Sequence, residues 1–375
     1  MRFRIYFDEI GDGGIPEAYI QSFNFVSNLF KTYAGASLVI KDIKSGLINK
    51  IKTGLGVTVE FYDPNDVEKV YSNYMSVLSF KKFMGDGTTD IIEINLISSL
   101  FFENEVVTEA HEGNVSQILL TIFNNNLTNP RYKLDIDPTS DRSRYRYQIT
   151  ETYPNFIKKV SQYAYKDNGA VFLYHDPRGE LKLKGINSFL SIEPSYVAST
   201  LSTSQWGVKI DGSGMLLNLP ILNYIIDTTD NVSVSSVTSK FCGELFKSSD
   251  SFISEATFNG ICSLDNAQTK RTYPKRMDIY NWDITPDDAF AIACRKSFID
   301  TYMSYTVSIT TNDFLLDTLA IGNVIYLILP HNPTELSSSG NKVNGGEGKY
   351  MVTRVRYNFH DGVLKTFADL VQVGF

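Results

Sequence analysis

The stretch YQITETYPNFIKKVSQYAYKDNGAVFLYHDPRGELKLKG, residues 147–185, decides the fold class of this chain. Its first half predicts a helix, because Thr152 is a suitable N-cap and Pro154 suits the first turn. Apolar residues recur at helical spacing at Phe156, Ile157, Val160, Tyr163 and Ala164. Gly169 is expected to end this helix.

The second half of the stretch predicts a β-hairpin. AVFLYH, residues 170–175, favours a strand, and DPRG at 176–179 suits a type I turn with proline second and glycine fourth. ELKLK, residues 180–184, alternates as a returning strand does. A helix followed by a hairpin is a packing unit, and nothing in it has the pattern of a reactive site.

Two further helices are indicated by apolar periodicity. One begins at Asn114 and ends in the asparagine run at 124–126. Its apolar face comprises Val115, Ile118, Leu119, Ile122 and Phe123. The other opens at 285–288, TPDD, where an N-cap, a proline and two acids suit the first turn. Its apolar face comprises Phe290, Ala293, Cys294, Phe298 and Tyr302.

Strand patterns flank these helices on both sides. The chain contains 22 Tyr and 24 Phe, and aromatic residues favour strands. Strands are predicted at 23–30, 36–42, 56–62, 70–81 and 90–101, and in the tail at 305–310, 323–329, 350–359 and 364–373. Weaker patterns lie at 207–210, 222–227 and 232–238. The Ser, Gly and Asn-rich segment 334–348 is expected to be a mobile loop.

The composition limits the classes of function. A length of 375 residues suggests two or three domains, and 43% hydrophobic with 21% charged residues is ordinary for a folded protein. The formal charge of -7 argues against a protein that grips nucleic-acid phosphates, because such binding depends on clustered Lys and Arg. Transient passage of DNA past the protein is compatible with this charge.

The cysteines and the apolar segments of the sequence indicate the cellular compartment in which the protein folds. Cys242, Cys262 and Cys294 are widely spaced and odd in number, so we expect buried thiols and neither disulfides nor a metal site. The start of the chain lacks the apolar core of a signal peptide, and no run approaches the roughly 20 apolar residues that span a bilayer. We therefore expect synthesis and folding in a cytoplasm and no stable membrane insertion.

No catalytic set is evident in the sequence. Acid-base and nucleophilic catalysis need groups of tuned pKa within mutual reach. Surface or strand positions are predicted for the histidines, which show no metal-ligand spacing: His111, His175, His331 and His360. Plain loop and helix-start roles are expected for the acidic pairs Glu103 with Glu105 and Asp287 with Asp288. The prediction is no enzyme and no catalytic, cofactor-binding or metal-binding residue.

Two local patterns have alternative interpretations. Asp135, Asp137 and Asp141 could form a calcium loop, but the glycine and terminal Glu of an EF-hand are missing, so a solvated loop is favoured. RSRYRY, residues 142–147, alternates arginine with tyrosine, which could suit single-stranded nucleic acid. An exposed edge strand whose arginine charges prevent unwanted pairing is favoured there.

The order of elements resembles the hub proteins of bacteriophage tails. These are the trimeric ring proteins of contractile-tail baseplates, their counterparts at the tail tip of long non-contractile phages, and the base of type VI secretion spikes. The family's recurrent segment of strand, Glu-Thr, aromatic helix, Gly, strand, turn, Gly and strand is matched by ThrGluThr at 150–152, Phe156 and Gly169. Further similarity lies in IIEINLISSLFFENE at 91–105, TPDDAFAIA at 285–293, AIGNVIYL at 320–327 and GKYMVTRVRYNF at 348–359.

The resemblance implies an α+β, mostly β fold: two tube-type β-barrel domains with an inserted helical α+β domain. The first barrel is expected at 1–104 and the α+β domain at 105–185. The second barrel is expected at 186–240 and 304–375, with a second part of the α+β region at 241–303. The opening stretch would then be scaffold, braced by Phe156, Val160 and Phe172, that holds a barrel at its angle.

The resemblance also implies a function as a structural hub at the distal end of a phage tail. A homotrimer would form a ring that continues the tube channel and adapts a six-fold tube to a three-fold tip. Expected partners are distal tail or tube proteins, spike or fibre proteins and the tape measure protein, while DNA would only pass through the channel. The expected location is the virion tail, in the baseplate or tail tip, after assembly in the host cytoplasm. The last predicted strand ends near Phe375, so no lytic domain or spike-gripping extension is expected, and contractile and flexible tails both stay open.

Two other functions stay open. A tail-associated peptidoglycan hydrolase would need a carboxylate pair or metal-bound histidines in a cleft. The candidate carboxylates are Glu103, Glu105, Asp135 and Asp137. A host receptor-binding or carbohydrate-binding tail protein would present exposed aromatic side chains on loops.

Overall fold

The structure, a computed structural model, describes most of the chain. The described residues are 3–8, 14–42, 49–62, 69–84, 90–102, 105–125, 133–167, 169–194, 196–199, 208–209, 215–220, 222–228, 286–302, 305–312, 316–328, 347–360 and 362–374. Their strands form one 14-stranded sheet and two smaller sheets of four and two strands. The predicted class, α+β and mostly β, is confirmed.

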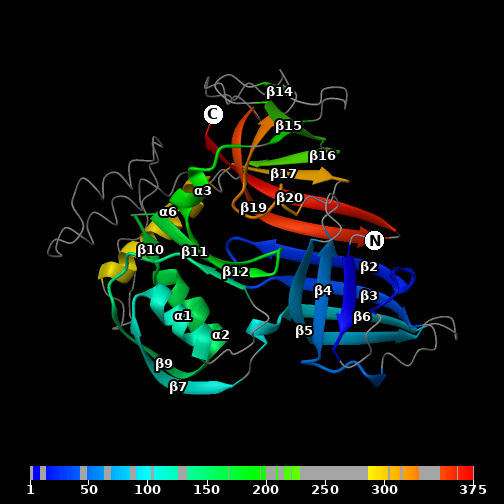
Figure 1. Cartoon of the computed structure of the whole chain (residues 1–375), viewed down its shortest axis with the longest axis horizontal. Coiled ribbons are helices and arrows are strands. Elements are labelled where there is room, and N and C mark those ends of the chain that lie inside the picture. The colour runs from blue at the N-terminus through cyan, green and yellow to red at the C-terminus, as the bar shows by residue number, and fades with distance from the viewer. Residues whose placement is uncertain are drawn as a thin grey trace.

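The first six strands build one half of the large sheet. They are β1 (Phe3–Phe7), β2 (Ile20–Asn28), β3 (Gly35–Asp42), β4 (Gly56–Tyr62), β5 (Val70–Met84) and β6 (Asp90–Ser98). They pair in the order β1-β4-β5-β6-β3-β2, and their alternating apolar residues bury one face. The sheet curls until Phe3 of β1 stacks on Phe23 of β2, with 5.0 Å between ring centroids. We call these strands the N-terminal half-sheet (Figure 1).

The later strands build the C-terminal half-sheet. They are β13 (Tyr196–Ser199), β14 (Val208–Lys209), β15 (Met215–Pro220), β16 (Asn223–Thr228), β17 (Tyr305–Thr311), β18 (Val324–Ile328), β19 (Glu347–His360) and β20 (Val363–Gly374). Their order is β16-β17-β20-β19-β18-β13-β15-β14. Strand β13 runs parallel to β15 and β18, whereas the other pairs in this half are antiparallel.

Strands β2 and β19 join the two half-sheets. They pair antiparallel, with Asn28 opposite Arg354 at one end and Ser22 opposite His360 at the other. Aromatic rings on the buried side cross this joint, since Phe25 lies 6.2 Å from Tyr357 and Phe3 lies 5.1 Å from Phe359 between ring centroids. The two half-sheets therefore share one hydrophobic core.

The four-stranded sheet carries the hairpin of the 147–185 stretch. Its order is β10 (Tyr165–Lys166), β11 (Gly169–Asp176), β12 (Glu180–Gly185) and β8 (Lys133–Ile136). Helices α1 (Val115–Asn125) and α2 (Tyr153–Val160) lie beside it. Val171 and Leu173 of β11 pack into the core of these helices, whereas Phe172 and Tyr174 pack into the core of the large sheet. Strand β11 therefore lies between two cores, which explains its continuous apolar run.

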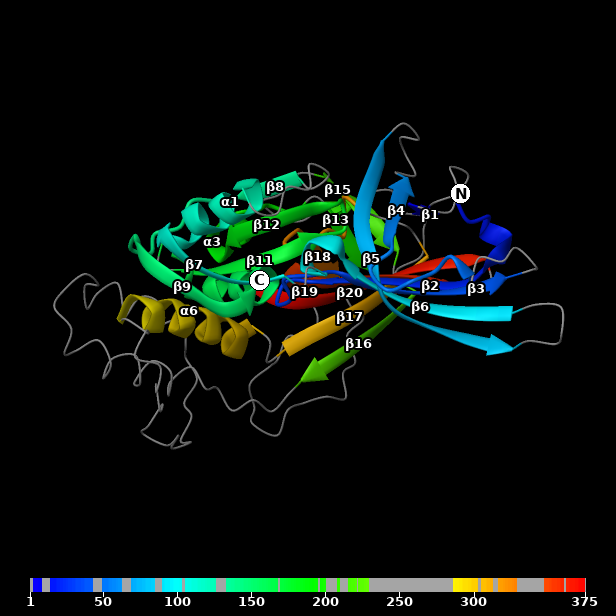
Figure 2. The ribbon, with the colours of Figure 1, turned by 90° about the horizontal axis from the view of Figure 1, so that it is seen from below.

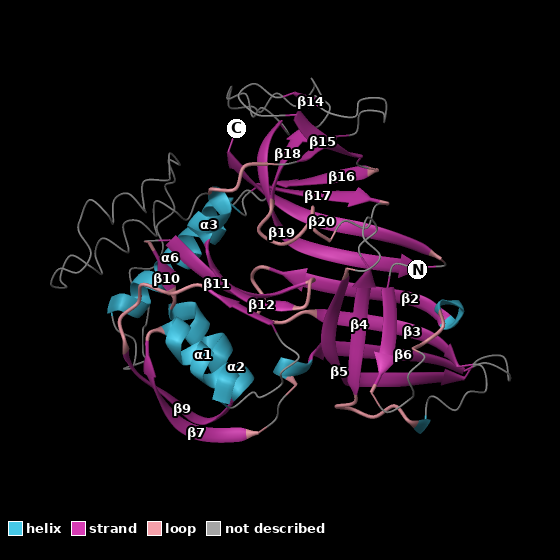
Figure 3. Cartoon of the chain, in the orientation of Figure 1, coloured by secondary structure: helices cyan, strands magenta, loops and turns pink. Residues whose placement is uncertain are grey.

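The remaining elements cover the flanks of the small sheet. They are α3 (Ile186–Leu190), α6 (Pro286–Tyr302), and the two-stranded ribbon of β7 (Val106–Gly113) and β9 (Arg144–Thr152). On α6, Phe298 lies 5.3 Å from Phe172 of β11 between ring centroids. Figure 3 shows that the longer helices gather on the side of the small sheet, away from the N-terminal half-sheet.

Several predicted elements are confirmed. The helices beginning near 114 and 285 and the hairpin around DPRG lie where the patterns placed them. Helix α1 buries all the residues of its predicted apolar face. The side chain of Thr152 caps α2 by accepting a hydrogen bond from the backbone N–H of Asn155. These features depend on short-range signals, which explains why they could be read from the chain.

The predicted end of α2 at Gly169 is wrong. The α-helix ends at Val160, a single 3₁₀ turn follows, and Ala164 is extended with φ -87° and ψ 137°. Tyr165 and Lys166 then pair with β11, which Gly169 begins. Strand pairing therefore competes with the helical pattern at Tyr163 and Ala164 and ends the helix earlier.

Several elements were not predicted. They are β1, β7, β8, β10, β13, β15 and α3, most of which are short, and β7 exposes Glu109 and Glu112. The predicted strand at 232–238 and most of the loop predicted at 334–348 lie outside the described residues. Among the described residues, no helix is long and apolar enough to cross a membrane.

Candidate functional site at the junction of the two half-sheets

The turn of the β11–β12 hairpin, residues 176–179, packs against the N-terminal half-sheet. The N–H of Gly179 donates a 2.9 Å hydrogen bond to the carbonyl of Asp176, which closes the turn. Gly179 has a φ of +81°, where glycine is favoured. A Cβ atom there would overlap the backbone carbonyl oxygen of Ser72 on β5. Only glycine permits this approach of the turn to the backbone of β5.

Two buried hydrogen bonds fix the hairpin on the same half-sheet. The hydroxyl of Ser27 on β2 donates to the carbonyl of His175. The side-chain amide of Asn73 on β5 donates to the carbonyl of Pro177 at 2.8 Å. A buried carbonyl without a partner costs free energy, so these two bonds favour one position of the hairpin.

An ion pair around the buried carboxylate of Asp176 lies within the turn. Arg178 donates from Nε and Nη2 to the two carboxylate oxygens of Asp176, both at 2.8 Å. The Nζ atom of Lys182 lies 3.1 Å from Oδ2 of Asp176 and 3.0 Å from Oε2 of Glu180. Burial alone would raise the pKa of Asp176, but the hydrogen bonds and charge of Arg178 outweigh it and hold that pKa below its ordinary value. Asp176 is therefore an ionised and paired carboxylate.

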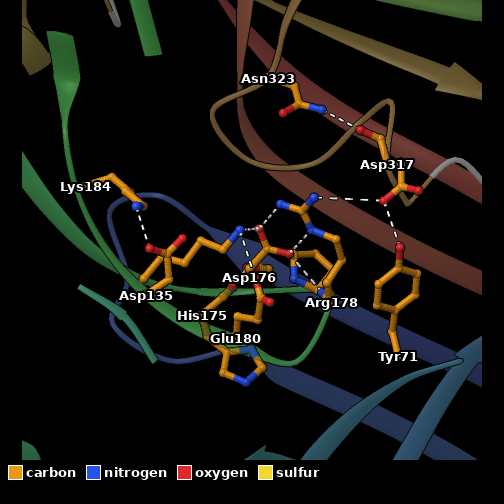
Figure 4. Close-up of polar contacts among 12 residues, drawn as sticks. Tyr71, Asp135, His175, Asp176, Arg178, Glu180, Lys184, Asp317 and Asn323 are labelled. Atoms are coloured by element: carbon orange, nitrogen blue, oxygen red, sulfur yellow. Dashed lines mark hydrogen bonds and ion pairs between the residues drawn. The ribbon is translucent and has the colours of Figure 1, made fainter. Parts of the chain in front are cut away.

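Asp317, between β17 and β18, connects this ion pair to the C-terminal half-sheet. It accepts hydrogen bonds from the hydroxyl of Tyr71 at 2.9 Å and from Nζ of Lys69 at 2.8 Å. Nη1 of Arg178 lies 3.9 Å from its Oδ1 atom, and Figure 4 shows Arg178 between Asp176 and Asp317. Burial would raise the pKa of Asp317, but the bonds from Lys69 and Tyr71 lower it. The hairpin, β5 and the β17–β18 connection thus meet at one polar cluster. We call it the junction cluster, and its members are Lys69, Tyr71, Asp176, Arg178, Glu180, Lys182 and Asp317.

His175 lies directly before the junction cluster and is buried. Burial lowers the pKa of His175 to about 4, although the charge of Asp176 acts in the opposite direction. Neither ring nitrogen has a hydrogen-bond partner among the described residues. The imidazole is therefore neutral at pH 7, and protonating it would place a charge in the core.

A second ionic cluster docks the start of α6. Asp287 and Asp288 are buried in the first turn of this helix, where the helix dipole favours negative charge. The hydroxyl of Tyr165 donates to Asp287 at 2.9 Å, Nη2 of Arg146 donates to Asp288 at 2.8 Å, and Arg144 also pairs with Asp288. Burial lowers the pKa of Arg146 to about 10. The expected plain helix-start role of the two acids is therefore incomplete, because Asp288 also anchors α6 to β9 and Asp287 anchors it to β10.

The RSRYRY segment lies in an edge strand, as predicted, since β9 pairs only with β7 in the described part of the chain, but the predicted role of its arginines is wrong. Strand β9 turns Arg146 into the protein and leaves Tyr145 and Tyr147 exposed. The arginines do not protect an exposed edge, because they neutralise Asp288 across 144 and 142 positions of the chain. A pairing partner so distant cannot be read from alternation alone.

The three aspartates of the possible calcium loop have other partners. Nζ of Lys184 lies 2.6 Å from Oδ1 of Asp135 and 2.7 Å from Oδ1 of Asp137. Burial would raise the pKa of Asp137, but the hydrogen bond from Lys184 outweighs it and lowers that pKa. Asp141 is buried and accepts from the backbone N–H of Val115 at 2.8 Å, so the predicted solvated loop is wrong for this residue.

The other predicted candidates are not brought together. His111 is buried on β7, with Nε2 3.1 Å from Oε1 of Gln148, while His360 is exposed at the end of β19. Cys294 is a buried thiol, as predicted, and Glu105 is exposed. Outside the described residues lie His331, Glu103, Cys242 and Cys262. In the described part of the chain, no three His, Cys, Asp or Glu side chains are grouped to hold a metal ion.

Sequence reasoning missed the roles of Asp176, Arg178 and Asp317. The DPRG turn was a partial signal, since aspartate at the first turn position bonds to the backbone two residues later, as it does here at 2.9 Å. The burial of Asp176 and the approach of Asp317 had no local signal.

Comparison with known proteins gives similarity in structure. No family model matches the sequence. No curated protein matches it. The tail protein from Neisseria meningitidis MC58 superposes with a TM-score of 0.56 and 10% identity, over 99% of this chain and 97% of that chain. The 43 kDa tail protein of prophage MuSo2 from Shewanella oneidensis gives 0.54 and 10%, over 100% and 98%.

The chain has the fold of phage tail proteins. A third solved structure agrees: the E. coli c3393 protein, a component of the type VI secretion system with structural similarity to the T4 bacteriophage tail proteins gp27 and gp5. It gives a TM-score of 0.53 and 7% identity over 98% of this chain and 76% of that chain. The likeness to tail hubs expected from the sequence is confirmed for the tail-protein fold, which spans almost the whole chain.

Proposed function

We propose that this protein is a structural hub at the distal end of a phage tail. Three copies form a ring whose channel continues the tail tube and adapts six-fold to three-fold symmetry. Its partners are distal tail or tube proteins, spike or fibre proteins and the tape measure protein. The protein resides in the virion tail and assembles in the host cytoplasm.

The observation that carries this proposal is the extent of the structural likeness. Two tail proteins match over nearly their whole length and nearly the whole of this chain. A partial match could reflect one common domain, whereas this likeness includes both half-sheets and also the four-stranded sheet with helices α1, α2 and α6, which we call the helical unit. In the proposal, the tube-type barrels correspond to residues 1–104 and to 186–240 with 304–375.

The junction cluster supports a role as a rigid scaffold. The hairpin turn touches β5 through backbone and side-chain contacts, and Asp317 contacts both Arg178 and Tyr71. Together with the β2–β19 pairing, these contacts hold the helical unit and both half-sheets in one arrangement. A ring that connects two symmetries requires such a fixed angle between its barrels.

The carboxylates considered for hydrolysis support a structural role. Asp135 and Asp137 share the ammonium group of Lys184, and the pKa of Asp137 is lowered mainly because lysine hydrogen bonds outweigh its burial. A general acid in a glycosidase needs a raised pKa. We therefore propose that the protein is not an enzyme. In a zymogram, neither the unaltered protein nor its Glu103→Gln variant is expected to clear peptidoglycan.

Electron microscopy of the purified full chain tests the hub function. Class averages are expected to show a three-fold ring with a central opening, and mass photometry should give three times the mass of the chain. A protein that stays monomeric at high concentration and binds no tail protein would contradict the proposal.

A further inference from the structure

The two-stranded ribbon of β7 and β9 is covered on its inner side. There the ring of His111 packs on Phe156 of α2, with 4.9 Å between centroids, and Arg146 pairs with Asp288 of α6. In the described part of the chain, β7 and β9 pair only with each other. A two-stranded ribbon has little stability of its own in water, so a segment that packed on its other side would stabilise it.

The outer side of the ribbon is apolar and exposed. Tyr145, Tyr147 and Ile149 of β9 are 57%, 59% and 66% exposed, and Val106 of β7 is 55% exposed. Ala110 lies opposite Tyr147 in the register and is exposed as well. Contiguous apolar surface of this kind marks a contact with another segment or molecule. The other exposed residues of the two strands are Thr108, Glu109, Glu112 and Thr150.

The exposed charges of the ribbon are negative. Glu112 lies opposite Tyr145 in the register and is hydrogen-bonded to its hydroxyl. Glu109 is exposed on β7, and the exposed Glu105 directly precedes that strand. No lysine lies on either strand, and the two arginines of β9 pair with Asp288. A segment that fits the outer side should therefore combine apolar and basic side chains.

One segment of the sequence has this composition. Residues 270–276, KRTYPKR, contain four basic residues and no acidic one, and no other seven-residue stretch of the chain has so many bases. Residues 277–284, MDIYNWDI, continue it with two aspartates and a majority of apolar side chains. Those apolar residues are Met277, Ile279, Tyr280, Trp282 and Ile284.

The position of this segment along the chain places it near the ribbon. It lies outside the described residues and ends just before α6, which begins at Pro286 and is held to β9 by Asp288 and Arg146. Figure 2 shows the ribbon and α6 at the same end of the molecule, away from β4 and β5. Arg276 precedes Pro286 by ten positions, which span up to about 33 Å when extended. The nine residues of β9 span about 30 Å, so the segment can reach the whole outer side.

We propose that residues 270–284 of this chain cover the outer side of the ribbon. The bases of 270–276 lie against Glu109 and Glu112, where the rings of Tyr145 and Tyr147 add cation–π contacts. The apolar side chains of 277–284 pack beside these rings and remove them from water. The inference does not depend on the proposed ring, because the ribbon and the segment belong to one chain.

A carbodiimide crosslink tests this contact in the full-length protein. The reagent joins a carboxylate directly to a lysine amine, so it reports groups that touch. We expect amide bonds from Glu109 or Glu112 to Lys270 or Lys275, identified by mass spectrometry of the digested protein. A sample without rings would defeat the hub function and leave this inference standing.

A control pair and isotope labelling decide what the crosslinks mean. Glu193 and Lys349, which lie 2.7 Å apart at the surface, provide a control link in the same sample. Labelled and unlabelled protein, mixed before assembly, separate links within one chain from links between copies. Links between copies would place a neighbour's segment on the ribbon. No link from Glu109 or Glu112 beside an intact control link would leave the ribbon to another protein, and either result would overturn the inference.

Charge reversal provides a second test, with tryptic cleavage as the measurement. A bound segment resists trypsin, because cleavage needs local release of the chain. Glu109→Lys with Glu112→Lys should therefore speed cleavage after Arg271 about tenfold. Glu193→Lys, which reverses an exposed acid outside the ribbon, should leave this rate unchanged.

A compensating variant separates a lost contact from a damaged ribbon. Lys275→Glu with Arg276→Glu should also speed cleavage after Arg271. Combined with the two glutamate reversals, however, these changes should restore slow cleavage, because opposite charges face each other again. Fast cleavage in the combined variant, or unchanged cleavage in the two charge-reversed variants, would overturn the inference.

Discussion

The hydroxyl of Tyr71 lies 2.9 Å from Oδ1 of Asp317, which follows 246 positions later in the chain. This hydrogen bond connects β5 of the N-terminal half-sheet to the segment that leads into β18 of the C-terminal half-sheet. Arg178 approaches the same carboxylate from the hairpin at 3.9 Å. Three distant segments therefore converge on Asp317, and each contributes a separate test of the junction.

Gly179→Ala should destabilise the protein through a clash with β5. The substitution places a methyl group against the carbonyl oxygen of Ser72, so we expect a loss of about 2–4 kcal/mol in the free energy of unfolding by chemical denaturation. Gly362→Ala is the matched control, because Gly362 also has a φ of +81° but no atom within 4 Å of the added Cβ. Strain alone should cost the control about 1–2 kcal/mol. Equal losses in the two variants would show that the contact with Ser72 adds nothing.

Asp176→Asn should be strongly destabilising. It leaves the guanidinium of Arg178 and the ammonium of Lys182 without their buried carboxylate, and breaking a buried pair on one side costs about 3–5 kcal/mol. Glu193→Gln removes the exposed pair with Lys349 and should cost under about 1 kcal/mol. Urea denaturation of both variants at pH 7 measures the difference. A cost for Asp176→Asn as small as that of the control would contradict a buried, ionised pair.

His175 should make stability depend on pH between about 6.5 and 4. The unfolded imidazole takes up a proton below its ordinary pKa of 6.5, whereas the folded one resists until about 4. The free energy of unfolding should therefore fall as the pH falls through this window, by about 3 kcal/mol in total.

Two variants isolate this contribution. His175→Gln should remove most of the pH dependence between pH 6.5 and 5, where the unaltered protein should lose about 2 kcal/mol through this residue. His360→Gln, at the exposed end of β19, should keep the full dependence. Thermal or urea unfolding across this range provides the measurement, and an unchanged slope in His175→Gln would refute the assignment.

Asp288→Asn should loosen helix α6. The change leaves Arg146 buried without its partner carboxylate, and we expect a cost of about 2–4 kcal/mol. Amide hydrogen exchange should quicken in α6 and in β9, which share this cluster, more than in β19. Glu151→Gln, which removes a long contact with Lys159 at the surface, should leave all of these rates unchanged. Faster exchange spread evenly over the chain would indicate general destabilisation instead of local undocking.

Short-range patterns were sufficient for much of the secondary structure. Helix α1, the cap at Thr152, the DPRG turn and strand β4 each depend on neighbours within a few positions, and each lies where it was predicted. Longer-range competition explains the errors. Helix α2 stops at Val160 because Tyr165 finds a strand partner in β11, and no periodicity records such a partner.

The candidate site was less accessible to prediction than the fold. Alternation in RSRYRY correctly indicates a strand but leaves open which side is buried, because arginines and tyrosines are both amphipathic. Asp288 and Asp287 decide that side, because the arginines pair with the buried carboxylate of Asp288 and the hydroxyl of Tyr165 donates to Asp287. The aspartates at 135, 137 and 141 likewise took their roles from Lys184 and from the start of α1.

By itself, the order of residues determined that this chain forms mostly strands, with a helix and a hairpin at its centre, and that its motifs resemble those of tail hubs. Tertiary structure alone decided that β2 joins β19, that Asp176 is buried, and that Arg146 faces inward. The physical reason is distance along the chain: a turn or a helical face is encoded by adjacent residues, whereas the cost of burying a charge depends on partners that only the folded chain brings near.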